Sequence, residues 1–254
     1  MTFLTRYLFP LSCGYDWFAT VYVVYVLLTP FLNRLGEGLS KGEFGRFLLI
    51  LFAVFSVIPS VLFFSVDNLG VMGGYSLLWF IFLHYLTMYI RRCGVMLSRG
   101  GCLALYLGCC AVTFAVKVLQ MRIFGKEYWD LYRYCSVTVA IGSAALFLLF
   151  IRLPERHSKF WCLMGGTTFG VLLIHTQHYI RTDILWPRLV KPLLWCEKSP
   201  PAYMTHLVLS VIAVFSVCAV VDLMRKQLFA VIGKIIKRHG NADNSDTGLP
   251  CGKE

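Results

Sequence analysis

Long apolar segments alternate with short charged segments along most of this chain. Seven apolar segments stand out, each about as long as the ~20 residues that a helix needs to cross a hydrocarbon core. A backbone inside lipid must satisfy its own hydrogen bonds, so these segments predict helices rather than the alternating ten-residue strands of a β-barrel. They lie near residues 15–32, 47–64, 70–90, 101–119, 134–151, 160–180 and 207–223.

Composition agrees with an all-α integral membrane protein of about seven transmembrane helices. Hydrophobic residues make up 58% of the 254 residues and charged residues only 15%, against about 25% charged residues in soluble domains. We expect residues 1–237 to form the transmembrane domain and the polar segment 238–254 to be a disordered cytoplasmic tail. Most of the ten cysteines lie inside apolar segments, where a free thiol behaves as a small hydrophobe.

Charge predicts the orientation of the helices. The net charge of +11 comes from basic residues between the apolar segments and in the tail, so it indicates topology and lipid contact rather than nucleic-acid binding. With the C-terminus inside, residues 33–46, 91–100, 152–159 and 224–254 hold fifteen of the 24 basic residues, and the outer segments hold eight. Seven helices then place residue 1 outside, so we expect an odd number of helices to precede it.

Four stretches resemble one known family in the right order. They are Gly14-Tyr-Asp-Trp-Phe-Ala-Thr with Thr29-Pro-Phe-Leu-Asn, Gly74-Tyr-Ser-Leu-Leu-Trp-Phe-Ile-Phe-Leu running to Arg91, Gly170-Val-Leu-Leu-Ile-His, and Val221-Asp-Leu-Met-Arg. In these stretches the chain resembles the membrane acyltransferase-3 family. The likeness covers nearly the whole chain, although each stretch alone is short and apolar.

The resemblance implies both architecture and chemistry. Members are similar to one another in having about ten helices, and this chain resembles the C-terminal seven, which implies a missing N-terminal segment or a partner subunit. They transfer acyl groups, usually acetyl from acetyl-CoA, to hydroxyls of surface polysaccharides and other envelope glycans. The resemblance therefore implies acetyl-CoA as acyl donor without a bound cofactor, a glycan acceptor, membrane lipids as neighbours, and a place in the bacterial cytoplasmic membrane.

The chain departs from the family at its catalytic signature. Members carry an Arg or Lys with a His after ten intervening residues, and no Arg or Lys here has a His at that spacing. We therefore expect the chain alone to transfer no acetyl group, and measurable transfer by the chain alone would place the catalysis on His175 or His84. The alternatives are a catalytically inactive or partner membrane protein, or a glycan transporter, although paired inverted repeats are not evident.

Ionisable and aromatic residues in the apolar segments supply the candidate site. His175 closes the third matched stretch and is the candidate catalytic residue, because an imidazole can act as a base or stabilise an oxyanion. Arg181, His84 and Trp79 are candidates for substrate binding. The structural alternatives are an interfacial pair of His175 with His178, a packed helix–helix contact for His84, and an interfacial belt for Trp79. No metal-ligand spacing is present.

Three further patterns predict contacts. Asp222 and Arg225 are spaced for an ion pair on one helix face. Lys117 lies near the outer end of its segment, where it can extend to the membrane surface or pair with Asp16. The spacings Gly70-x-x-x-Gly74 and Gly166-x-x-x-Gly170 permit close helix contact. Pro59 predicts a kink in the second apolar segment.

Overall fold

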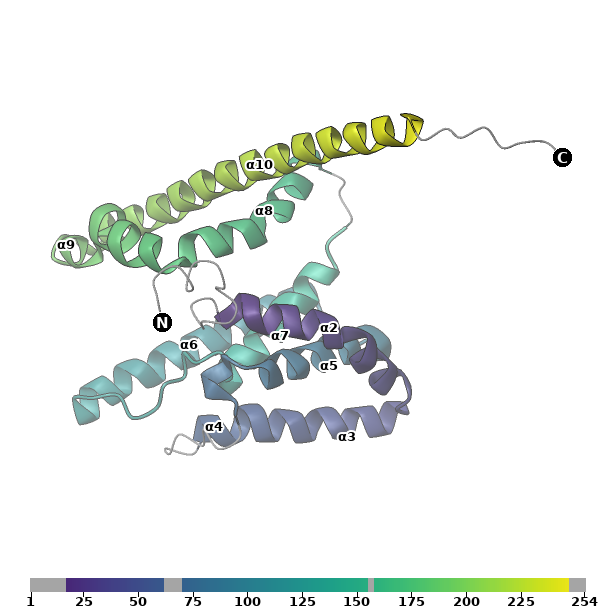
Figure 1. Ribbon diagram of the computed structural model, residues 1–254. Coiled ribbons are helices and arrows are strands. Elements are labelled where there is room, and N and C mark those ends of the chain that lie inside the picture. The colour runs from purple at the N-terminus through teal and green to yellow at the C-terminus, as the bar shows by residue number, and fades with distance from the viewer. Residues whose placement is uncertain (1–16, 62–69, 155–157, 247–254) are drawn as a thin grey trace. The chain divides into compact units, whose positions relative to one another are not determined.

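The computed structural model describes residues 17–61, 70–154 and 158–246, and these residues are all-α (Figure 1). They divide into two compact units, residues 1–155 and 156–254. Four helical segments are long and apolar enough to cross a membrane, which indicates an integral membrane protein. These segments are Trp17–Glu37, Lys41–Val61, Arg99–Phe124 and Pro200–Ile235.

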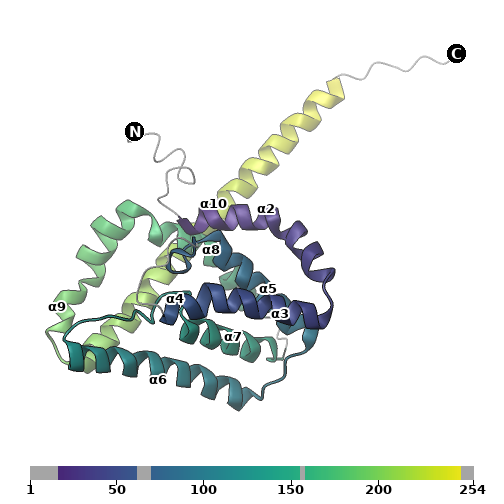
Figure 2. The same cartoon turned by 90° about the horizontal axis from the view of Figure 1, so that it is seen from below.

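Unit 1 is built around a central helix. Helix α5 packs against both α2 and α3, and α6 runs alongside α7 (Figures 1 and 2). Phe44, Phe82 and Tyr85 form the centre of its core together with Leu32. The helices are α2 (Trp17–Glu37), α3 (Lys41–Phe52), α4 (Ile58–Val61), α5 (Leu77–Cys93), α6 (Arg99–Phe124) and α7 (Val137–Ile151), with the short elements η1 (Ala53–Val57) and η3 (Met72–Gly74).

Serine and glycine set several of the helix ends in this unit. Ser40 forms a capping box with Glu43 at the start of α3, and the Ser98 side chain accepts from a backbone N–H in the first turn of α6. Gly94 and Gly125 end α5 and α6 in the left-handed conformation, which glycine adopts without a steric penalty. These signals explain why each helix stops close to the edge of its apolar segment.

Pro59 is accompanied by a distortion one turn before it. The second apolar segment runs from α3 through the π-helical η1 to α4, which contains Pro59. Proline has no N–H and its ring crowds the carbonyl four residues earlier, which here is the carbonyl of Phe55 inside η1. The widened π turn accommodates that crowding. The sequence therefore predicted an irregularity in this segment, and in the structure it is a π turn.

The expectation of a helix from Gly70 onward was wrong. Helix α5 begins at Leu77, and Gly70, Gly73 and Gly74 all have positive φ angles, which an α-helix does not contain. A Cβ atom at Gly74 would lie within 3.2 Å of the backbone of Tyr134 and Cys135, so the small residue permits a close loop contact. The Gly70-x-x-x-Gly74 spacing therefore marks a turn and not a helix–helix interface.

Basic side chains gather at one end of unit 1, which we call the basic end. Arg92 donates to the carbonyl oxygen of Gly36 at 2.7 Å, and Arg99 donates to that of Arg152 at 2.9 Å. The guanidinium of Arg152 in turn contacts the carbonyl oxygen of Leu97. These bonds satisfy carbonyls at and beyond helix C-termini, where cations are also favoured by the helix dipole.

Aromatic side chains gather at the opposite end of unit 1. The ring of Tyr75 lies 4.6 Å from that of Trp17 and 4.9 Å from that of Tyr134, measured between centroids. At the same end the backbone N–H of Val137 donates to Ser60 Oγ at 3.0 Å. The starts of α2, α5 and α7 therefore meet the end of α4, so successive long helices run in opposite directions.

Lys117 pairs with a residue that the sequence pattern did not single out. Its ammonium group forms an ion pair with Glu127, which follows the end of α6, and Asp16 lies outside the described residues. The neighbouring Gln120 side chain accepts from the backbone N–H groups of Tyr128 and Trp129 and donates to the carbonyl of Trp129. These bonds fold the segment after α6 back onto the helix end.

Unit 2 contains a helical hairpin and two short elements. Helices α8 (Lys159–Thr176) and α10 (Pro200–Asp246) lie side by side, with η4 (Ile180–Val190) and α9 (Pro192–Cys196) between them in sequence (Figure 1). At 1.5 Å per residue α10 is about 70 Å long, more than twice the ~30 Å thickness of a hydrocarbon core. Part of α10 must therefore lie outside the hydrocarbon.

The end of α10 differs from the expected tail. The helix continues to Asp246, whereas the sequence favoured disorder from residue 238, and residues 247–254 lie outside the described part of the chain. Extension of an existing helix adds one hydrogen bond per residue and needs no new nucleus.

Candidate functional site

His175 lies in the last turn of α8, and its ring is oriented by the helix itself. Its Nδ1 atom lies 2.7 Å from the carbonyl oxygen of Val171, one turn earlier. A carbonyl oxygen can only accept, so Nδ1 carries the hydrogen in this bond and, in the neutral ring, Nε2 keeps its lone pair. An imidazole held in this tautomer has the arrangement that a general base needs.

The end of α8 leaves His175 beside a change in chain direction. Gln177 has φ −54° and ψ 129°, so the backbone becomes extended two residues after His175. The Gln177 side-chain oxygen accepts from the backbone N–H of Ile180, and the carbonyl of Gln177 accepts from the N–H of Arg181. The π-helical η4 begins there, and π turns occur frequently at functional sites.

Arg181 lies in the first turn of η4, and His178 precedes it. Both side chains are exposed, and His175 is half-buried. Arg181 lies six positions after His175, so the end of α8 and the start of η4 carry the two residues within one unit. Acyl-transfer sites use a base for the attacking hydroxyl and a cation or other donor for the oxyanion.

A buried carboxylate fixes α8 against α10. The side chain of Asp222 is 1% exposed and lies 2.7 Å from Arg225 Nη2 and 2.9 Å from Lys226 Nζ. The predicted Asp222–Arg225 ion pair is therefore confirmed. Lys226 Nζ also donates to the carbonyl oxygen of Gly166 at 2.5 Å, so one ammonium group joins both helices. We call these groups, together with Gly170, the Asp222 clasp.

Gly170 provides the space for this carboxylate. A Cβ atom built at Gly170 would collide with the Asp222 carboxyl group, so only glycine fits. Thr167, on the same stretch of α8, is fully buried, and Val171 packs with Cys218 and Ala219 of α10. The close helix contact predicted from Gly166-x-x-x-Gly170 is present. It anchors the helix that carries His175.

His84 forms a polar contact in unit 1 that the sequence pattern did not reveal. Its Nδ1 lies 2.9 Å from the hydroxyl of Tyr25, which comes from α2, 59 residues earlier. The other ring nitrogen, Nε2, is buried without a hydrogen-bond partner among the described residues. Because a buried polar atom without a partner is unfavourable, this nitrogen is available to bind a hydroxyl or other polar group.

Trp79 lies in the hydrophobic core of unit 1. Its side chain is 4% exposed and its ring centroid lies 4.9 Å from that of Phe82. In this structure the indole packs the interior of the unit rather than a surface belt. A substrate-binding role for Trp79 remains a prediction.

The candidate residues fall into two sets. His175 and Arg181 belong to unit 2, and His84 and Trp79 belong to unit 1. Sequence reasoning missed Tyr25, because a tyrosine in an apolar helix gives no signal until its partner is known. It also missed a stacked contact at the start of α10, where the rings of Trp195 and His206 lie 4.2 Å apart and Lys198 lies 3.8 Å from the Trp195 centroid.

Comparisons with protein-family models, curated proteins and solved structures found no match to the chain. The likeness to membrane acyltransferases therefore stands on the four stretches alone. Among the described residues, no group of three or more His, Cys, Asp or Glu side chains is placed to hold a metal ion.

Proposed function

We propose that this protein is a membrane O-acyltransferase that passes acetyl from acetyl-CoA to a hydroxyl of an envelope glycan. The observation that carries the proposal is the bond between His175 Nδ1 and the Val171 carbonyl. It supplies an oriented base in a chain that lacks the Arg-x10-His signature of the acyltransferase-3 family. The four stretches that resemble this family support the same reaction class.

The proposed chemistry assigns one role to each residue. His175 Nε2 accepts the proton of the acceptor hydroxyl as that oxygen attacks the acetyl carbonyl carbon. Arg181 stabilises the oxyanion of the tetrahedral intermediate. Collapse of the intermediate breaks the carbon–sulfur bond and releases CoA as the thiolate, which takes the proton from the imidazolium. The products are an acetyl ester and free CoA.

In living cells, expression of the chain should add O-acetyl groups to envelope polysaccharide. The measurement is proton NMR of polysaccharide extracted from cells with the gene and from cells with an empty vector. Alkali, which cleaves esters, should remove the new acetyl signal. Polysaccharides with identical acetyl content in both strains would contradict the proposal.

A second candidate function is a catalytically inactive membrane partner of another acyltransferase. The missing Arg-x10-His signature favours it. The two functions differ in what the protein does alone, because a partner would raise acetylation only when the other subunit is present. Expression with and without a separate acyltransferase therefore distinguishes them.

We infer that the bundle crosses the membrane seven times, with the basic end of unit 1 and the C-terminus on the cytoplasmic side. The clustering of Arg92, Arg99 and Arg152 at one end supports this orientation, because cytoplasmic loops carry an excess of Lys and Arg. Reporter fusions after Asn33, Ser65, Arg99, Arg133, Lys159 and Lys198 should alternate between inside and outside, starting inside. Two consecutive fusions on the same side would contradict the topology.

His84 is proposed to bind substrate through its unpaired Nε2. Replacing His84 by phenylalanine removes this nitrogen while retaining an aromatic ring, so the KM for the acceptor should rise and kcat should change little. Tyr25→Phe serves as the control, because it removes the hydroxyl that faces Nδ1 and leaves Nε2 in place. An unchanged KM in His84→Phe would show that His84 only packs between helices and does not bind the acceptor.

A further inference from the structure

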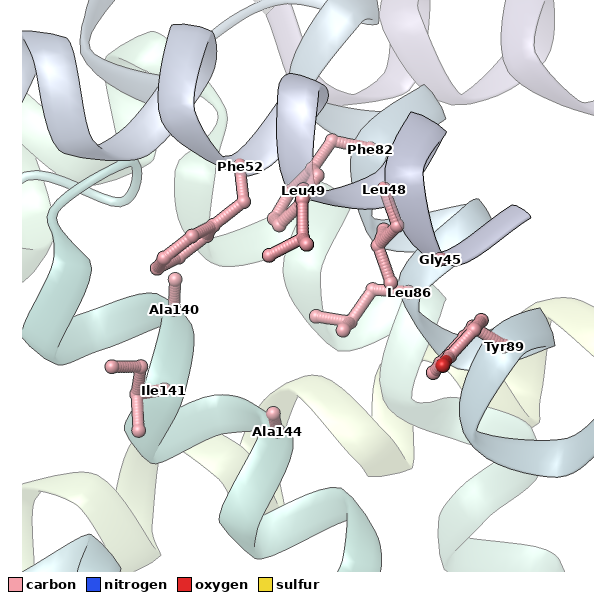
Figure 3. A pocket seen from close by; sticks show the side chains of 10 residues that line it. All are labelled: Gly45, Leu48, Leu49, Phe52, Phe82, Leu86, Tyr89, Ala140, Ile141 and Ala144. Atoms are coloured by element: carbon pink, nitrogen blue, oxygen red, sulfur yellow. The ribbon is translucent and has the colours of Figure 1, made fainter. Parts of the chain in front are cut away.

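An apolar pocket opens between three helices of unit 1 (Figure 3). It has a volume of about 380 Å³ and is lined by α3, α5 and α7. The small residues Gly45, Ala140 and Ala144 create the space, since larger side chains at these positions would fill it. Leu49 lines the pocket and is 67% exposed, so the pocket opens towards the surroundings of the bundle.

The pocket runs along the helices towards the basic end. Gly45 and Phe52 both line it and are seven residues apart on α3, which corresponds to about 10 Å. Figure 3 shows the hydroxyl of Tyr89 near Gly45, whereas the ring of Phe52 lies near Ala140 at the other end. The Tyr89 oxygen is the one side-chain polar atom in the lining.

Basic residues outnumber acidic ones in the first turns of α3 and the last turn of α5, at the end of the pocket that Tyr89 occupies. Arg46 follows Gly45 on α3 and Arg91 lies two residues after Tyr89 on α5, and both are exposed. The nearby carboxylate of Glu43 is engaged by the backbone N–H and hydroxyl of Ser40 in the capping box. The pocket is therefore apolar along its length, and exposed basic residues lie close in sequence to its lining residues at the Tyr89 end.

We propose that this pocket binds one acyl chain of an anionic phospholipid, whose headgroup contacts Arg46 and Arg91. Three of the four long apolar helices belong to unit 1 and indicate that it lies in a bilayer, where acyl chains are the available apolar ligand. An unfilled pocket would forfeit the dispersion contacts of its lining, and an entering chain restores them. Basic side chains next to the membrane surface attract anionic headgroups. This site goes beyond the proposed acyl transfer and does not depend on it.

Native mass spectrometry of the full chain in mild detergent, with added dioleoyl phosphatidylglycerol or phosphatidylcholine, tests the proposal. The wild-type protein should retain one phosphatidylglycerol in preference to phosphatidylcholine. Ala144→Phe and the milder Ala144→Leu should lose this lipid, because they fill the pocket. Ala104→Phe is the matched control, since Ala104 is exposed on α6 and does not line the pocket, and it should bind as the wild type does.

The charge requirement has a separate test. The double variant Arg46→Gln, Arg91→Gln should bind phosphatidylglycerol roughly thirtyfold more weakly, because each basic side chain near an anionic surface contributes about fivefold. Binding of phosphatidylcholine should not change. Two results would overturn the proposal: an Ala144 variant that elutes like the wild type and keeps the lipid, or a wild-type protein that binds both lipids equally.

Discussion

Replacing His175 by alanine should lower the rate of acyl transfer by about 10²- to 10⁴-fold, the usual contribution of a positioned acid–base group. The imidazole makes its described hydrogen bond to the carbonyl of its own helix, so its removal breaks no described hydrogen bond between helices. The variant should insert and accumulate like the wild type. The loss should appear in kcat, because the proton is transferred only in the reaction itself.

The matched control is His178→Ala. This histidine lies one turn further along the chain, is exposed, and falls outside the stretch that resembles the acyltransferases. Its replacement should have a much smaller effect on the rate. A folded His175→Ala protein with full activity would show that His175 only packs the end of α8, and the proposed base would then have to be sought elsewhere.

Replacing Gly170 by valine should destabilise unit 2 by about 3 kcal/mol, the upper range for overpacking a well-packed site. The new side chain would occupy the space of the Asp222 carboxylate. To relieve the collision, α8 must move away from α10 or Asp222 must leave its two cations. The first change breaks the bond from Lys226 to the Gly166 carbonyl, and the second breaks the ion pairs of Asp222 with Arg225 and Lys226. Thermal unfolding in detergent measures the loss.

Gly165 offers a control on the same helix. A Cβ atom at Gly165 meets no other atom within 4 Å, so Gly165→Val changes helix propensity alone. Its unfolding temperature should stay close to that of the wild type. Equal unfolding temperatures for Gly170→Val and Gly165→Val would mean that the Asp222 clasp does not hold these helices together.

The hydrophobic pattern predicted where most of the helices lie, because each is long, apolar and bounded by serine or glycine. It failed at Gly70–Gly74, where a run of glycine and apolar residues contains four positive φ angles, at Gly70, Met72, Gly73 and Gly74. It also failed to predict the length of α10, since extension of a helix depends on propagation and not on apolar side chains. An apolar segment therefore predicts that a membrane helix is present more accurately than it predicts where that helix begins and ends.

Contacts within a helix were predictable and contacts between helices mostly were not. The Asp222–Arg225 pair follows from residue spacing, whereas the reach of Lys226 to Gly166 requires the approach that Gly170 permits. The Tyr25–His84 bond joins residues 59 apart, and the pocket near Ala144 is formed by three helices. The sequence pattern indicates that polar groups in apolar helices need partners without specifying which partners they find.

Acetyl transfer by the purified chain tests the proposed function most directly. The full protein is reconstituted in vesicles and supplied with radiolabelled acetyl-CoA and an oligosaccharide acceptor. We predict that alkali-labile acetyl esters accumulate on the oligosaccharide with the wild-type protein and not with His175→Ala. Ester formation no higher than in protein-free vesicles would contradict an acyltransferase acting through His175.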